Sequence, residues 1–178
     1  MNERAAQYVL DKRDRIEWVN DAWRQFAEAN GAPSLADGVI GTELWRYVAG
    51  PETQAIYRTL FDRAREGREI RVPYRCDSPT MIRDFELTVS RVGDAGLRCE
   101  TRVVEERSRP PIVLLDAAAP RADGLIHMCG WCKRVKLQDW VDAEDAVNVL
   151  GLFTGGPVPQ ITHGICPECM ERVLAAMG

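Results

Sequence analysis

The stretch IRVPYRCD at residues 70–77 decides the fold class, because its apolar and polar side chains alternate with a period of two. Such alternation is typical of a strand with one buried face and one solvent face. The same period recurs at residues 81–89 and 97–103, and the run GDAG at residues 93–96 predicts a hairpin turn between them. Three consecutive strands of this kind predict an antiparallel sheet whose apolar face needs a covering layer.

The segments before this stretch predict two more strands and the covering layer. Residues 7–19 alternate around a polar turn and predict a hairpin. Asn20 predicts the N-cap of a first helix, and Pro51 and Gly67 bound a second helix with one apolar stripe. The expected fold class is therefore α+β: a five-stranded antiparallel sheet with helices on one face, followed by a small module that contains four cysteines.

Two motifs within this region resemble a PAS domain. They are IEWVNDAW at residues 16–23 and GTELW at residues 41–45, and the resemblance, which includes the order of elements, covers residues 7–106. The resemblance implies a sensory and dimerising module, and hence a homodimer. It also implies a cleft between helices and sheet, in which some members of the family hold haem, flavin or a small acid.

Two of these cofactors do not match the sequence. The haem-binding members use a His on the helical side, but His127 and His163 lie outside the resembling region. The flavin-binding members carry a reactive Cys in an Asn-Cys-Arg motif on the helical segment, whereas the first cysteine here is Cys76. A small-molecule ligand in the cleft and a cleft filled by side chains both stay open. Cys76 and Cys99 fall on the apolar phase of their strands, where buried, unreactive thiols are expected.

The composition argues against a nucleic-acid-binding, a secreted or a membrane-anchored protein. A net charge of −4 and a pI near 5.3 argue against a nucleic-acid-binding surface, which would need clustered Lys and Arg. Residues 1–7 contain no apolar stretch, so we expect neither a secretory signal nor a membrane anchor, and a cytoplasmic location without a membrane partner. Thiols in the cytoplasm are kept reduced, so closely spaced cysteines there predict metal ligands or redox groups rather than disulfides.

Four of the six cysteines form two CxxC pairs: Cys129 with Cys132, and Cys166 with Cys169. Two residues between cysteines let both sulfurs of a tight turn face one point, and two such turns supply the four thiolates of a tetrahedral zinc site. We therefore predict structural zinc on these four residues. Iron or an iron-sulfur cluster on the same thiolates is the alternative, because spacing alone does not separate the two.

The residues around the pairs refine this prediction. His163 is expected to hydrogen-bond a sulfur from the second shell, with direct ligation as the alternative. Lys133, Arg134 and Lys136 are expected to form a solvated face. The second pair opens a predicted terminal helix at Pro167, whose N-terminal dipole favours thiolate over thiol.

The chain is expected to divide into residues 1–107 (PAS-like sensor domain), 108–124 (linker with one short strand) and 125–178 (zinc-binding module). The module predicts a helix after Asp142 and a turn at Gly155-Gly156-Pro157, with Phe153 in its core. A module of about 50 residues has a small hydrophobic core and commonly needs additional stabilisation, for example by a bound metal ion.

The module resembles the C-terminal cysteine segment that follows sensor domains in bacterial signalling proteins. The pattern is CxWCK, then a Trp, then THGxCPxC. The matching residues are Cys129, Trp131, Cys132, Lys133, Trp140, Thr162, His163, Gly164, Cys166, Pro167 and Cys169.

The sequence contains no phosphate-binding glycine loop, nucleophile elbow, HExxH or kinase motif. Catalytic zinc keeps one position open, whereas four cysteines fill all positions. We therefore expect no enzyme activity, and a sensing or interaction protein that acts through a signalling partner protein. The alternatives are a redox or metal sensor with iron, and a nucleic-acid-binding regulator.

Overall fold

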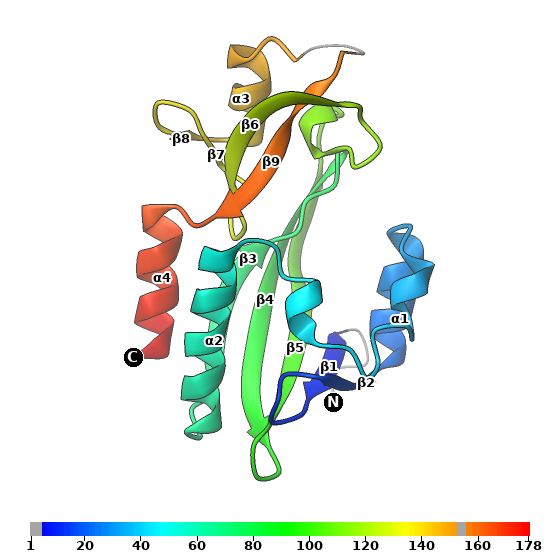
Figure 1. Cartoon of the computed structure of the whole chain (residues 1–178), viewed down its shortest axis with the longest axis vertical. Coiled ribbons are helices and arrows are strands. Elements are labelled where there is room, and N and C mark those ends of the chain that lie inside the picture. The colour runs from blue at the N-terminus through cyan, green and yellow to red at the C-terminus, as the bar shows by residue number, and fades with distance from the viewer. Residues whose placement is uncertain (1–4, 153–155) are drawn as a thin grey trace.

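The computed structural model describes residues 5–152 and 156–178, and contains two sheets with helices around them (Figure 1). Residues 1–4, Phe153 and Gly155, which entered the sequence predictions, lie outside the described residues. No helix in the described part of the chain is long and apolar enough to cross a membrane.

The first sheet has five strands in the order β2-β1-β5-β4-β3, and all neighbouring strands are antiparallel. Its strands are β1 (Ala6–Leu10), β2 (Ile16–Val19), β3 (Ile70–Arg75), β4 (Met81–Val92) and β5 (Gly96–Ser108). Between β2 and β3 lie α1 (Asp21–Ala29), the 3₁₀ helices η1 (Pro33–Leu35) and η2 (Leu44–Arg46), and α2 (Pro51–Arg65). The predicted five-stranded antiparallel sheet is confirmed.

Asn20 links the first helix to the sheet. Its side-chain oxygen accepts hydrogen bonds from the backbone N–H groups of Trp23 and Gln7, both at 2.9 Å. Its amide nitrogen donates to the carbonyl oxygen of Ala5 at 2.8 Å. One side chain therefore caps α1, as the sequence predicts, and also fixes the start of α1 against β1.

Trp18 does not share the buried face of Ile16, although the alternation at residues 7–19 predicts both on the apolar side of one strand. Val9 pairs with Trp18 and Leu10 with Ile16, so Glu17 is an extra residue on β2. This bulge buries Ile16 and leaves Trp18 45% exposed. A strict period of two cannot anticipate such an insertion.

The second sheet was not predicted from the sequence. Its four strands have the order β8-β7-β6-β9, and β6 and β9 are parallel. The strands are β6 (Arg121–Cys129), β7 (Val135–Lys136), β8 (Trp140–Val141) and β9 (Val158–Gly164). Two α-helices belong to this part: α3 (Ala143–Val149), close to its predicted position after Asp142, and α4 (Pro167–Met177), which begins at the predicted residue.

The segment predicted as a linker contributes to a packed core. The expected short strand at residues 112–115 is instead the 3₁₀ helix η3 (Val113–Leu115). Ile112 and Leu114 are buried beneath the second sheet, beside Met128 and Ala146. Apolar side chains of this segment thus complete a small core of the second sheet, which explains why an apolar run stands there.

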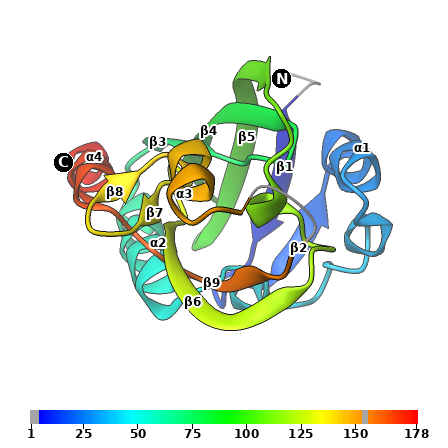
Figure 2. The same cartoon turned by 90° about the horizontal axis from the view of Figure 1, so that it is seen from above.

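The larger core crosses between the two parts of the chain. It joins α2, represented by Leu60 and Phe61, to Trp131 and to Val173 of α4. Helix α4 packs against β3, and α2 lies close by in both views (Figures 1 and 2). The division at residues 107 and 125 remains a prediction, but the two parts share one hydrophobic cluster.

Polar contacts also join the two parts. The backbone N–H of Arg75 donates to the carbonyl oxygen of Trp131 at 2.6 Å. The buried Arg109 guanidinium bridges the Asp77 carboxylate, at 3.1 Å, and Glu144 of α3, at 2.9 Å. Because Asp77 has a fully buried side chain, this bridge neutralises a charge that would be costly alone.

Gly50 marks a close approach between the first turn of α2 and β9. Its φ is +87°, and a Cβ there would lie 2.5 Å from the carbonyl oxygen of His163. We expect Gly50→Ala to lower the free energy of unfolding for two reasons. The left-handed backbone conformation costs an alanine about 1–2 kcal/mol, and the clash of its methyl group with His163 costs about 1–3 kcal/mol more. Gly31→Ala is the matched control, because Gly31 has a φ of +73° with no atom within 4 Å of its Cβ position. Denaturant unfolding that gives equal losses for both variants would contradict this close approach.

Candidate metal centre

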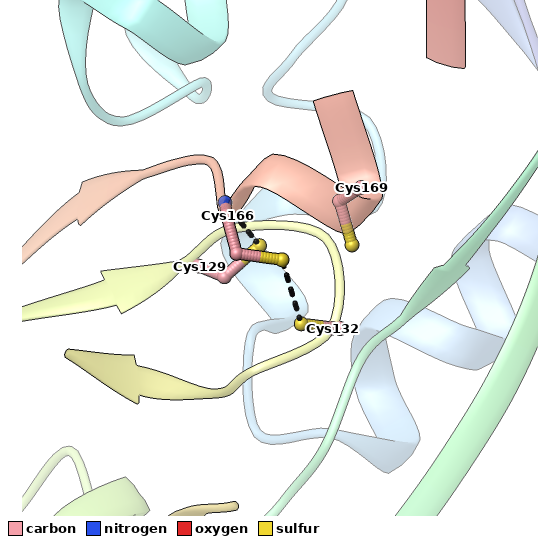
Figure 3. A group of neighbouring side chains, drawn as sticks. All are labelled: Cys129, Cys132, Cys166 and Cys169. Atoms are coloured by element: carbon pink, nitrogen blue, oxygen red, sulfur yellow. Dashed lines mark hydrogen bonds between the residues drawn. The ribbon is translucent and has the colours of Figure 1, made fainter. Parts of the chain in front are cut away.

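The first cysteine pair lies in a tight turn that leaves β6. The backbone N–H of Lys133 donates to the carbonyl oxygen of Cys129 at 3.0 Å, and the N–H of Cys129 donates to the carbonyl oxygen of Arg134 at 2.7 Å. Lys133 closes the turn with a φ of +63°. This geometry places the side chains of Cys129 and Cys132 on the same side of the turn, facing α4 (Figure 3).

The second pair lies at the start of α4. Cys166 is the N-cap residue of this helix, and Cys169 lies in its first turn. The parallel pairing of β6 and β9 sets Cys129 opposite Gly164, with the Gly130 N–H donating to the Gly164 carbonyl at 2.9 Å. The predicted convergence of the four cysteines is observed: their sulfurs all lie within 4.8 Å of one another.

The distances between sulfurs fit a metal site better than disulfides. Cys132 Sγ and Cys166 Sγ are 3.7 Å apart, whereas a disulfide bond measures about 2.04 Å. Four sulfurs at about 2.3 Å from a tetrahedral ion would be about 3.8 Å apart. All six cysteines are free thiols. The backbone N–H of Cys166 also donates to Cys129 Sγ at 3.4 Å, the kind of contact that stabilises a thiolate.

The pKa values of the clustered cysteines indicate whether their thiols can ionise together without a cation. Hydrogen bonds from the Cys132 and Cys169 thiols lower the pKa of Cys129, and backbone N–H groups add to this effect. The interaction with Cys129 in turn raises the pKa of Cys132 to about 12 and raises that of Cys169. The Cys129 thiolate is therefore favoured and those of Cys132 and Cys169 are disfavoured, so a cation at the centre would be needed before these three ionise together.

Arg172 is a residue of the site that the sequence analysis missed. Its guanidinium donates a hydrogen bond to Cys169 Sγ at 3.0 Å. Arg172 follows Cys169 by three residues on α4, and residues at this spacing share a helix face. The helical spacing could have identified it. Its positive charge offsets part of the negative charge that four thiolates would place there.

His163 lies on β9 and is one of the residues that line a cavity beside the first cysteine turn. Burial lowers the pKa of His163, and the nearby Lys133 ammonium lowers it further. In the described part of the chain no hydrogen bond joins the imidazole to a cysteine sulfur. A second-shell role for His163 remains a prediction.

The three basic residues beside the turn do not form one solvated face. Lys133 is half-buried and donates from Nζ to the Gly130 carbonyl oxygen at 2.8 Å. Arg134 forms an ion pair with Glu168 at 2.6 Å, and Lys136 is exposed. The predicted solvated position is therefore wrong for Lys133. Its left-handed backbone conformation turns the side chain back over the cysteine turn, where it contacts the Gly130 carbonyl.

Cys99 and Cys76 have different environments. Cys99 is fully buried, and burial raises the pKa of its thiol to about 12, which agrees with the predicted unreactive role. Cys76 is half-buried and follows the end of β3, where it lines the same cavity as His163. The predicted buried position is thus wrong for Cys76, since β3 ends at Arg75.

Several solved structures are similar to the chain. Among them is the PAS domain of the Cronobacter turicensis RpfR quorum-sensing receptor in complex with C12:0. The chain is 18% identical to it, with a TM-score of 0.37, over 57% of this chain and 95% of that chain. No family model and no curated protein matches the chain. The α+β fold class rests on the strand order and pairing of the chain's own sheets.

We expect Cys166→Ser to weaken metal binding more than about a hundredfold, beyond the range of outer-shell changes, because a thiolate ligand is lost. Hydrogen exchange should show loss of protection mainly after residue 124, while the five-stranded sheet persists with lower stability. Cys76→Ser is the matched control and should retain the metal. Cooperative loss of both parts in Cys166→Ser would contradict the predicted division of the chain.

Arg172→Met should lower metal affinity by about 10- to 100-fold, because the hydrogen bond and charge at Cys169 disappear while the length of the side chain is kept. Competition with a chromophoric chelator measures this change. Arg63→Met, an exposed change on α2, serves as control. Equal affinities of the Arg172 variant and the unaltered chain would show that the guanidinium does not support the centre.

Proposed function

We propose that the chain is a cytoplasmic, non-catalytic sensor of the bacterial signalling type. In it a PAS-type sheet and a zinc centre on Cys129, Cys132, Cys166 and Cys169 act together through a partner protein. The observation that carries the proposal is the position of the sulfurs. Cys129, Cys166 and Cys169 belong to the hydrophobic cluster that also contains Leu60 and Phe61 beneath the first sheet.

The donor set supports zinc. Four thiolates from two CxxC turns form a closed tetrahedral set, and bound zinc would fix β6 and α4 relative to each other without redox change. Such a closed set leaves no position for substrate, which supports a non-catalytic role. The resemblance to sensor-associated cysteine segments adds the signalling context.

The contact between α2 and the first cysteine turn could transmit a signal from one part of the chain to the other. Tyr57 of α2 packs against Trp131 of the first cysteine turn, with ring centroids 5.1 Å apart. Movement of α2 upon sensing would therefore act directly on the turn that carries Cys129 and Cys132. The exposed apolar side chains Leu125, Val149 and Leu174 offer contact area for a partner, and we propose that the chain forms a homodimer.

Elemental analysis with native mass spectrometry tests this function on freshly purified protein. We expect one zinc per chain, a dimer mass and no visible absorbance. Red or brown protein with stoichiometric iron would replace this proposal with the iron-dependent redox sensor, since thiolate-bound iron is coloured. Salt-dependent retention of DNA would instead favour the nucleic-acid-binding regulator.

A partner screen tests the signalling role. The full chain loaded with zinc should retain a signalling protein in a pull-down, and the Cys166→Ser chain should retain less of it. Recovery of no signalling partner with the zinc-loaded chain would count against action through a partner.

A further inference from the structure

A cavity of about 240 Å³ lies between the two parts of the chain, beside the cysteine turn. Thr53 and Tyr57 of α2 line it from one side, Arg75 at the end of β3 from another, and Trp131, Lys133 and His163 from the second part. Cavities for drug-sized ligands measure about 300–1,000 Å³, so this one suits a smaller molecule.

Two residues that line this cavity each have a buried polar atom without a hydrogen-bond partner within the described ranges. Thr53 and Trp131 are 6% and 3% exposed, and neither Thr53 Oγ1 nor Trp131 Nε1 has a hydrogen bond in the described part of the chain. Thr53 Oγ1 lies 3.5 Å from the position of a Cβ on Gly130, so the hydroxyl faces the cysteine turn. Unsatisfied buried groups are rare and costly, and two of them at one cavity indicate a ligand that accepts hydrogen bonds.

The charges at the cavity favour an anion. The Lys133 ammonium donates to the Gly130 carbonyl, and it forms no ion pair with a carboxylate among the described residues. Arg75 is already paired with Asp77, at 2.5 Å. No Asp or Glu is among the described residues that line the cavity. A ligand with negative charge would thus meet the Lys133 ammonium, with which no carboxylate among the described residues pairs, and no Asp or Glu in the described lining.

The walls favour an apolar body on that anion. The rings of Tyr57, Tyr74 and Trp131 form part of the lining, together with the small apolar side chains of Val48 and Ala49. Aromatic walls stabilise planar or aliphatic groups by burial. Strongly hydrated anions such as phosphate would gain nothing from these walls.

We propose that this cavity binds a small organic monocarboxylate, and that its binding is coupled to the metal centre through the Cys129–Lys133 turn. The carboxylate accepts hydrogen bonds from Lys133, Thr53 and Trp131. Because Trp131 lies between two of the cysteines and Lys133 directly follows Cys132, ordering these residues around a ligand also orders the turn that holds the metal. The coupling rests on the proposed metal-binding function, whereas the carboxylate site does not.

Coupling between two sites is reciprocal. If the metal pre-orders the turn, the metal-loaded chain must bind the carboxylate more tightly than the metal-free chain. By the same factor, the carboxylate must raise the affinity for metal. Typical coupling corresponds to about 5- to 150-fold changes in affinity.

The binding test uses the full metal-loaded chain with benzoate and butyrate as probes, and benzamide and butyramide as neutral controls of the same shape. Titration calorimetry should detect the acids and not the amides. Lys133→Met should weaken acid binding at least about tenfold through loss of the charged partner. Lys136→Met is the control on the exposed neighbouring strand and should bind normally.

Thr53→Val gives a more specific result. Replacing an unsatisfied buried hydroxyl by a methyl group of similar shape should leave the stability of the ligand-free chain unchanged or raise it. The same change should weaken benzoate binding about three- to tenfold, because one hydrogen bond is lost. A structural role of Thr53 alone would lower stability and leave binding unchanged, which would overturn its assignment to the site.

The coupling test measures the metal affinity by equilibrium competition with a chromophoric chelator. Benzoate at a concentration that just saturates the unaltered chain should raise this affinity at least about fivefold there and have a clearly smaller effect in Lys133→Met. If the chain holds metal but none of the acids binds, the carboxylate site is wrong and the metal centre stands. If the acids bind and the chain takes up no metal, the proposed function and the coupling fail and the carboxylate site stands.

Discussion

The parallel pairing of β6 with β9 is the constraint on which the second half of the structure depends. It aligns Cys129 with Gly164, two residues before Cys166, and so brings together two cysteine pairs that are far apart in the chain. Backbone hydrogen bonds alone would not keep four thiols within 4.8 Å of one another in a charged state. A cation bound there would remove the repulsion, so the sheet pairing and such an ion would stabilise each other.

The position of the cysteine cluster connects it to both parts of the chain and not only to the C-terminal part. The cluster lies within the hydrophobic core of the first sheet, and the cavity beside it is lined from both parts of the chain. Tyr57, Trp131 and the Arg75 backbone connect the helical layer, the cysteine turn and the sheet edge directly. A change at any of the three therefore alters the environment of the other two, as the proposed sensing role requires.

Much of the first sheet could be predicted, because its signals are local. Alternation identifies β3 to β5, the Asn20 cap begins α1, and Pro51 begins α2, all close to their observed positions. The prediction was wrong at Trp18, where a bulge changes the phase of β2. The second sheet was missed because its strands lack a clear period: most of β6 is exposed, and β7 and β8 are two residues each.

For the candidate metal centre, the sequence by itself determined which four thiols could serve as ligands, since CxxC spacing alone lets both sulfurs of each pair face one point. It also determined that α4 begins at the second pair. Only the tertiary structure decided that the pairs meet inside the shared core, that Lys133 folds back over its turn, and that Thr53 faces Gly130. The physical reason is the sequence separation of the interacting residues. Turns and helix caps depend on residues that are neighbours in the chain, whereas a cavity or a core depends on how distant segments pack, and a local sequence pattern does not predict that packing.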